Sequence, residues 1–131
     1  MAMIIDSKIL NELTRQAKES PRLRVNYDLR DSENDSSQHI LNAVEPGTIM
    51  AIHRHQNTSE TVVCIRGQFE EYFYDDQGNI TNVFNMVPGG VVLIIPKCQW
   101  HSLKSLESGT VLMSFKDGAY EPIKEEDIYR K

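Results

Sequence analysis

The chain has few cysteines, no surplus of basic charge and no long apolar run. Two cysteines, Cys64 and Cys98, are too few for the disulfide framework of a small secreted domain. A net charge of −5 argues against nucleic acid as a partner, because phosphate binding needs a basic surface. The longest apolar run, residues 91–95, is strand-sized and far below the roughly 20 residues that span a membrane. We therefore expect neither nucleic acid nor a membrane as a partner.

The remaining bulk properties are those of an ordinary globular domain. The 131 residues suit one domain, and 40% apolar and 25% charged residues are typical values. The first residues, MAMIIDSK, lack a basic stretch followed by a long apolar one, so no secretory signal is predicted. Together with the scarce cysteine, this pattern indicates a reduced, cytoplasmic protein.

Residue periodicity predicts one helix followed by strands. Asp6 or Ser7 can cap a helix that ends at Ser20-Pro21. Its apolar face consists of Ile9, Leu10, Leu13 and Ala17. Alternation over residues 22–29 then predicts a half-buried strand whose polar face carries Arg22 and Arg24. We divide the chain into an N-terminal helical segment, 1–21, and a single β-domain, 22–131.

Short strand-like runs separated by turn residues fill the rest of the chain. They cover residues 38–45, 47–54, 60–66, 68–75, 80–87, 91–95, 100–106 and 110–116. Many short strands at close spacing predict an all-β sandwich or barrel. The charged tail, 117–131, has room for a short helix after Pro122.

Three of the four histidines form a pattern with metal-ligand chemistry. His53 and His55 are two residues apart, so on a strand both imidazoles point to one face. The turn at 56–59 reverses the chain and brings Glu60 beside them, and His101 opens a later strand. Three imidazoles and one carboxylate suit Fe, Mn, Zn, Ni or Co. The plainer alternative is a hairpin whose surface histidines happen to alternate.

The spacing of these residues resembles the two sequence motifs of the cupin superfamily. The first motif fits Gly47, His53, His55, Glu60 and Gly67, each at the expected distance. The second fits Gly90, Pro96 and His101, but Cys98 stands where the family usually has glycine and Ser105 where it usually has asparagine. The resemblance implies a jelly-roll β-barrel, after one N-terminal helix, with one divalent transition metal ion inside its mouth.

A closer resemblance is to the WbuC-type cupin fold metalloproteins, which are small bacterial proteins with a helix before the barrel. The similar stretches are residues 20–24, 41–47 and 118–122. The resemblance implies a homodimer and an association with surface-polysaccharide biosynthesis, but no reaction.

Four residues outside the ligand set are candidates for a substrate pocket. Arg22 and Arg24 can clamp an anion, or can form a solvated face that pairs with the acidic loop 31–37. Cys98 can be a soft ligand or redox-sensitive neighbour of His101, or can simply pack. Trp100 can wall the pocket or fill the core.

Three functions remain open, and the sequence identifies no catalytic residue for any of them. The first is a metal-dependent isomerase or epimerase acting on a small polar, sugar-derived metabolite. It is favoured by a polar rim of residues near the ligands, namely Arg54, Gln56, Asn57 and Gln99, to which Arg22 can also belong. The second is an Fe(II) dioxygenase, and the third is a non-catalytic module that binds a metal or small ligand. With any of these three functions, protons should compete with the metal ion for the histidine nitrogens at pH values near the ordinary histidine pKa of about 6.5.

Overall fold

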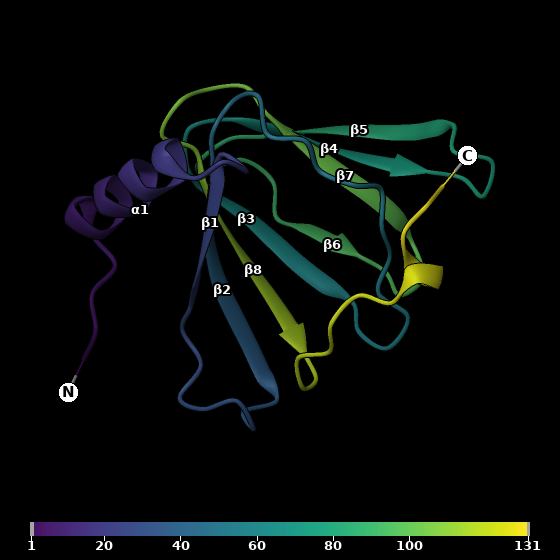
Figure 1. The fold of residues 1–131 in the computed structure, drawn as a ribbon, viewed down its shortest axis with the longest axis horizontal. Helices are drawn as coiled ribbons and strands as arrows, with labels where there is room; N and C mark the ends of the chain where they lie inside the picture. Colours follow the sequence, from purple (N-terminus) through teal and green to yellow (C-terminus); the bar gives the residue numbers. More distant parts are fainter. Residues whose placement is uncertain (1, 131) are drawn as a thin grey trace.

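The computed structural model describes residues 2–130 and consists of two antiparallel β-sheets with one α-helix (Figure 1). The elements are α1 (Ser7–Glu19), β1 (Arg24–Asp28), β2 (Ser37–Val44), β3 (Glu60–Arg66), β4 (Phe69–Tyr74), β5 (Ile80–Met86), β6 (Leu93–Ile95), β7 (Trp100–Ser105), β8 (Val111–Asp117) and the 3₁₀ helix η1 (Glu125–Asp127). The predicted all-β architecture with one N-terminal helix is therefore confirmed. No helix within residues 2–130 is long and apolar enough to cross a membrane.

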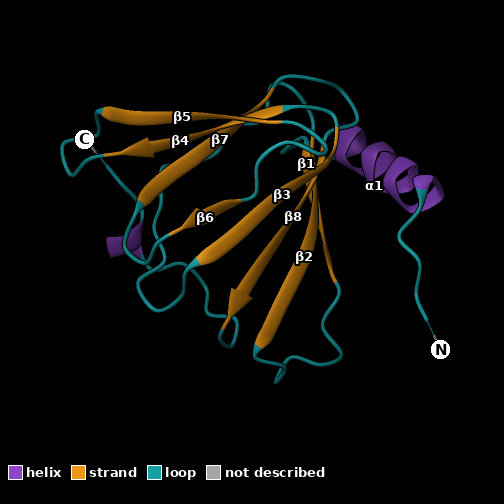
Figure 2. Ribbon diagram, turned by 180° about the vertical axis from the view of Figure 1, so that it is seen from behind, coloured by secondary structure: helices purple, strands orange, loops and turns teal. Residues whose placement is uncertain are grey.

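Strands that are distant in sequence lie side by side in both sheets. The five-stranded sheet has the order β1-β2-β8-β3-β6, and the three-stranded sheet has the order β5-β4-β7. The two sheets approach each other near α1 and spread apart toward the C-terminal segment (Figures 1 and 2). An apolar core fills the space between the sheets, with Phe69, Met86, Val62 and Leu112 among its members.

Helix α1 packs on the outer face of the five-stranded sheet, over β1, β2 and the start of β8. Asp6 caps the helix, because its carboxylate accepts hydrogen bonds from the backbone N–H groups of Lys8 and Ile9. Leu10, Leu13 and Ala17 are buried and pack with Leu41, Ala43 and Val111 of the sheet. The predicted apolar face of the helix is confirmed, and the five-stranded sheet is consequently covered on its outer face where β1, β2 and the start of β8 lie.

The segment between β2 and β3 differs from the prediction. Residues 47–54 do not form a strand; only His53 makes isolated β-bridges, to His101 and to Ile128. The expectation fails because this segment crosses the open end between the sheets. It therefore meets one residue of β7 on one side and one residue of the C-terminal segment on the other, and no strand runs along its length.

In an ordinary half-buried strand the polar face points to open solvent. The polar face of β1 borders the space between the two sheets instead. Val25 packs on the helix side, as the alternation predicts. Arg24 and Asn26 point in the opposite direction, which here is the space between the sheets. Arg24 lies opposite Val44 of β2, itself a member of the inner core. Arg24 and Asn26 therefore border a cavity between the sheets.

Candidate metal centre

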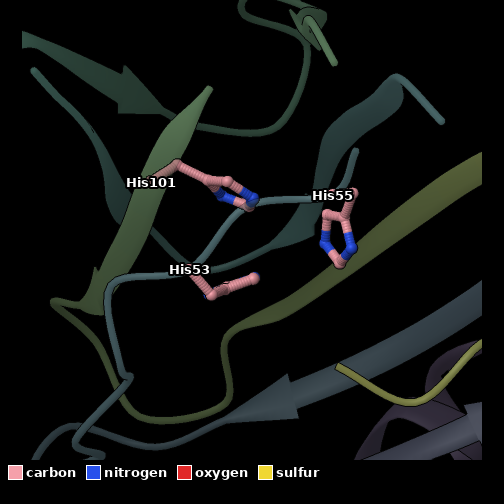
Figure 3. A group of neighbouring side chains, drawn as sticks. All are labelled: His53, His55 and His101. Atoms are coloured by element: carbon pink, nitrogen blue, oxygen red, sulfur yellow. The ribbon is translucent and has the colours of Figure 1, made fainter. Parts of the chain in front are cut away.

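Three histidines converge at the open end of the two sheets. His53 and His55 lie on the segment before β3, and His101 lies on β7, with the three rings around a common space (Figure 3). The ring centroids are 4.3 Å apart for His53 and His101, 5.1 Å for His53 and His55, and 5.6 Å for His55 and His101. One ligand atom from each ring lies within 4.8 Å of the others, so these three side chains could hold a metal ion.

Backbone hydrogen bonds fix the segment that carries two of these histidines. The N–H of His53 donates to the carbonyl of His101 at 3.0 Å, and the N–H of His101 donates back at 2.8 Å. The N–H of Cys98 donates to the carbonyl of His55 at 2.8 Å. On the other side, the N–H of Tyr129 donates to the carbonyl of Ile52. The segment is thus held between β7 and the C-terminal segment without belonging to a sheet.

Hydrogen bonds also set which ring nitrogen can bind a metal. The Nδ1–H of His53 donates to the carbonyl oxygen of Ala51 at 2.9 Å, which leaves the lone pair on Nε2. Burial, followed by the neighbouring His101, lowers the pKa of His53 to about 3. Burial likewise lowers the pKa of His101 to about 4. Both rings are therefore neutral at neutral pH, as metal ligation requires.

Glu60 lies beside the histidines at the start of β3. Its Oε1 is 3.5 Å from Nε2 of His55 and 3.8 Å from Nε2 of His101. Burial by itself would raise the pKa of Glu60, but the His55 ring and the charge of Lys116 outweigh burial and lower the pKa to about 2. A buried, ionised carboxylate consequently faces the imidazoles.

The donor set fits a cation. Within residues 2–130, Glu60 Oε1 and His101 Nε2 are both buried and neither has a hydrogen-bond partner. Two facing acceptors that lack a donor carry a desolvation cost of about 1–3 kcal/mol each. A divalent ion between them would satisfy both, and three nitrogens with one oxygen are a suitable set for a first-row transition metal.

Glu71 of β4 is a member of this cluster that the sequence analysis missed. Its side chain is only 2% exposed, and its Oε2 lies 3.2 Å from Nδ1 of His101. Burial, together with the nearby charge of Glu60, holds the pKa of Glu71 well above its usual range. Its position was available from parity, because Phe69, Glu71 and Phe73 alternate inward along β4. An oxygen that accepts the Nδ1–H of a histidine orients the ring toward a metal.

We expect Glu71→Ala to weaken zinc binding by roughly 10–100-fold, because His101 loses the acceptor that orients its ring. Glu71→Gln keeps an acceptor oxygen and should lose less affinity than Glu71→Ala. Zinc affinity can be measured by competition with a chromophoric chelator. Glu70→Ala, on the opposite face of the same strand, is the matched control. Equal zinc affinity for wild type and Glu71→Ala would contradict the orienting role.

A cavity of about 420 Å³ contains this cluster. This volume lies within the usual range for small-molecule sites. Arg22 and Arg24 line the cavity with the three histidines, Glu60 and Glu71. Polar side chains from the inner face of the five-stranded sheet complete the wall, namely Asn26, Asn42 and Ser114. The structure thus brings both arginines to the same cavity as the candidate ligands.

Cys98 and Trp100 lie elsewhere. Cys98 is exposed and has a φ of 68°, the left-handed region that favours glycine. Trp100 precedes His101 on β7, so the two side chains point to opposite faces. The indole of Trp100 packs against Arg54 and Tyr129 and donates to Asp76. Neither residue lines the cavity of the histidines.

The predicted polar rim is largely engaged by the C-terminal segment. The Arg54 guanidinium pairs with Asp127 at 2.9 Å, and the Gln56 amide donates to the same carboxylate. Asn57 donates to Glu121, while Gln99 donates to backbone carbonyls. Side chains of that segment, including Tyr120 and Ile123, border the cavity instead. The expected short helix after Pro122 is η1 of this segment.

Solved structures with the same fold have low sequence identity to the chain. An uncharacterized conserved protein with a double-stranded β-helix domain from Klebsiella pneumoniae matches with a TM-score of 0.69 at 16% identity over 100% of both chains. KdgF from a Halomonas species matches with 0.62 at 13% identity, over 78% of this chain and 84% of its own. The capsular polysaccharide assembling protein CapF from Staphylococcus aureus matches with 0.67 at 19% identity, over 84% of this chain and 32% of its own.

These likenesses establish the fold and leave the activity open. The protein has the double-stranded β-helix, or cupin-type, fold, with a three-histidine group able to hold a metal ion. Residues 5–86 match the family described as Domain of unknown function (DUF6016), and the chain belongs to this family. No curated protein matches the chain. The matched residues include His53, His55 and Glu60 and end before His101.

Proposed function

We propose that the chain is a WbuC-type cupin metalloprotein that isomerises or epimerises a small polar, sugar-derived metabolite. In this proposal His53, His55, His101 and Glu60 hold one divalent transition metal ion. The observation that carries the proposal is the pair of facing acceptors, Glu60 Oε1 and His101 Nε2, which have no partner among residues 2–130. When bound, such an ion supplies Lewis-acid polarisation of a carbonyl or hydroxyl oxygen.

The chain's own residues bind and orient the metabolite in this scheme. Asn26, Asn42 and Ser114 offer amide and hydroxyl groups along one wall, which suits a ligand rich in hydroxyl groups. The C-terminal segment borders the cavity through Tyr120 and Ile123, which offer an aromatic and an aliphatic contact to a ligand. The likeness to CapF, a capsular polysaccharide assembling protein, further supports a sugar-derived ligand.

Anaerobic reconstitution tests the reaction class. Apoprotein is loaded separately with Mn²⁺, Co²⁺, Zn²⁺ and Fe²⁺ and screened against sugar phosphates and nucleotide sugars, with oxygen uptake followed in parallel. We expect turnover with Mn²⁺, Co²⁺ or Zn²⁺ in the absence of air, because polarisation needs only charge and an open coordination position. His39→Ala, a histidine outside the cavity lining, serves as the control variant and should match wild type.

Two results would contradict this reaction class. Activity with Fe²⁺ alone, accompanied by stoichiometric oxygen uptake, would identify a dioxygenase. Tight binding of a metabolite without turnover for any ion would identify a non-catalytic binding module.

A further inference from the structure

Three basic side chains enter the cavity of the candidate metal centre from the five-stranded sheet and the turn before it. We propose that Arg22, Arg24 and Lys116 form an oxyanion-binding subsite there. The ligand is accordingly a hydroxyl-bearing carboxylate or phosphate ester rather than an uncharged sugar. This inference deepens the proposed function and rests on it, because it assigns the ligand class of the same cavity.

The sheet register directs these side chains into the cavity. Arg24 on β1 lies opposite Val44, whose side chain is in the inner core. Lys116 on β8 lies opposite Glu60 on β3, and directly paired residues share one face of a sheet. The charge of Lys116 contributes to the lowered pKa of Glu60, as expected for neighbours. Arg22, two residues before Arg24, lines the same cavity.

None of the three cations has an acidic partner within the described part of the chain, residues 2–130. Neither arginine nor Lys116 makes an ion pair there. Arg24 donates only to the backbone carbonyl of Ile49, at 3.0 Å, and this bond leaves most of its guanidinium donors free. By contrast, Arg15, Arg30, Arg54 and Arg130 all pair with carboxylates. Two adjacent unpaired guanidinium groups are a suitable receptor for an oxyanion, which they can bind in bidentate fashion.

The backbone between the two arginines is strained and firmly held. Leu23 has a φ of 58°, a conformation that costs a non-glycine residue about 1–2 kcal/mol. Its carbonyl accepts hydrogen bonds from the N–H of Glu45 and from the hydroxyl of Thr48, both at 2.9 Å. Its own N–H donates to Ser20 at 3.0 Å. Such strain is concentrated at functional sites, and here it fixes the turn that carries Arg22 and Arg24 to one cavity.

The charge of the cavity favours an anion. Its lining contains three basic side chains, Arg22, Arg24 and Lys116, and three acidic ones, Glu60, Glu71 and Glu121. With all six groups ionised these charges balance, and protonation of Glu71 only makes the sum more positive, so a divalent ion held by neutral imidazoles leaves the cavity with a net positive charge. A carboxylate or phosphate ester offsets that charge, whereas a neutral polyol does not.

A titration with small probes tests the subsite. Zinc-loaded, ¹⁵N-labelled protein is titrated with glycolate, glycerol 3-phosphate and uncharged glycerol, and the arginine Nε–H signals are followed by NMR. We expect Arg22 and Arg24 signals to shift with at least one of the two acids, and the tighter acid identifies the anion as carboxylate or phosphate. Arg22→Met/Arg24→Met should weaken that acid at least tenfold, while Arg15→Met, which removes an exposed helix cation, leaves the affinity unchanged.

The controls separate this inference from the metal centre. Arg22→Met alone alters an exposed side chain, so it should fold and show an intermediate affinity. Zinc content is measured on every variant and should stay stoichiometric. Equal acid affinity in the double variant and wild type, or glycerol binding as tightly as the acids, would overturn the subsite. Failure of wild type to bind zinc would overturn the metal centre instead. In that case, an apoprotein that still binds the acid through Arg22 and Arg24 would support the oxyanion-binding subsite.

Discussion

His101→Ala should bind zinc at least roughly a hundredfold more weakly than wild type. Four-ligand zinc sites contribute about 10–16 kcal/mol, so each ligand accounts for about 3 kcal/mol, which corresponds to a factor above one hundred. His53→Ala and His55→Ala should have effects of the same size. Glu60→Ala should lose less, because three imidazoles remain. Metal content after dialysis against a weak chelator, measured by mass spectrometry on untagged protein, provides the comparison.

His39→Ala is the matched control for this series. His39 lies on β2, its Nδ1 is 2.7 Å from the carbonyl of Ser37, and it does not line the cavity. This variant should retain wild-type metal content. His101 is 4% exposed, so its removal also leaves a void, and metal affinity is therefore measured under conditions where circular dichroism shows the variant folded. Stoichiometric metal in folded His101→Ala would refute the four-ligand centre.

The apoprotein should lose stability as pH falls below 6.5, because burial holds two histidines neutral in the folded state. The pKa of His53 is lowered to about 3 and that of His101 to about 4, from 6.5 in the unfolded chain. Between those values the unfolded chain binds more protons than the folded protein. The free energy of unfolding therefore decreases with decreasing pH, by up to about 1.4 kcal/mol per pH unit for each ring.

Two carboxylates modify this dependence in opposite directions. Glu71, with its raised pKa, binds its proton more tightly when folded, so it opposes the histidine effect above pH 4.5. Below pH 4.5 it is protonated in both states and its opposition ends. Glu60, with its pKa lowered to about 2, then adds a further loss of stability. The decline should accordingly be shallower between pH 6.5 and 4.5 than the two histidines alone would produce, and steeper below pH 4.5.

Urea unfolding of the apoprotein at several pH values measures this decline. His53→Gln/His101→Gln should abolish the decline between pH 6.5 and 4.5 and leave the opposite slope due to Glu71, and His39→Ala should leave the wild-type decline unchanged. Zinc should raise the free energy of unfolding at neutral pH, because the metal binds the folded state preferentially. An apoprotein whose stability is constant from pH 6.5 to 4.5 would contradict the burial of neutral imidazoles.

Local sequence patterns anticipated much of the fold. The spacing of Leu10, Leu13 and Ala17 predicted the buried face of α1, and Asp6 predicted its cap. Alternation predicted β1, because a side-chain period of two depends only on backbone geometry, and turn residues between short strand-like runs predicted most of the later strands. The motif that contains His53 and His55 led to the histidine group that converges in the structure.

Predictions from local patterns were wrong where contacts with distant parts of the chain decided whether a segment formed a strand or which groups its side chains bound. Residues 47–54 are a strand-like run between turn residues, but they find no partner strand. Arg54 and Gln56 were expected at a polar rim, but Asp127, more than seventy residues away, binds both side chains.

The sequence by itself determined the helix, the β-rich architecture and the identity of the histidines, since each depends on residue spacing along one segment. Only the tertiary structure decided that Glu71 supports His101, that Lys116 faces Glu60, and that the polar face of β1 borders a cavity. Only burial between the sheets lowered the pKa values of His53 and His101, so that protons compete with a metal at those two rings at lower pH than 6.5. These properties arise from the pairing of distant strands and the exclusion of water between two sheets, neither of which is encoded in any single stretch of the chain.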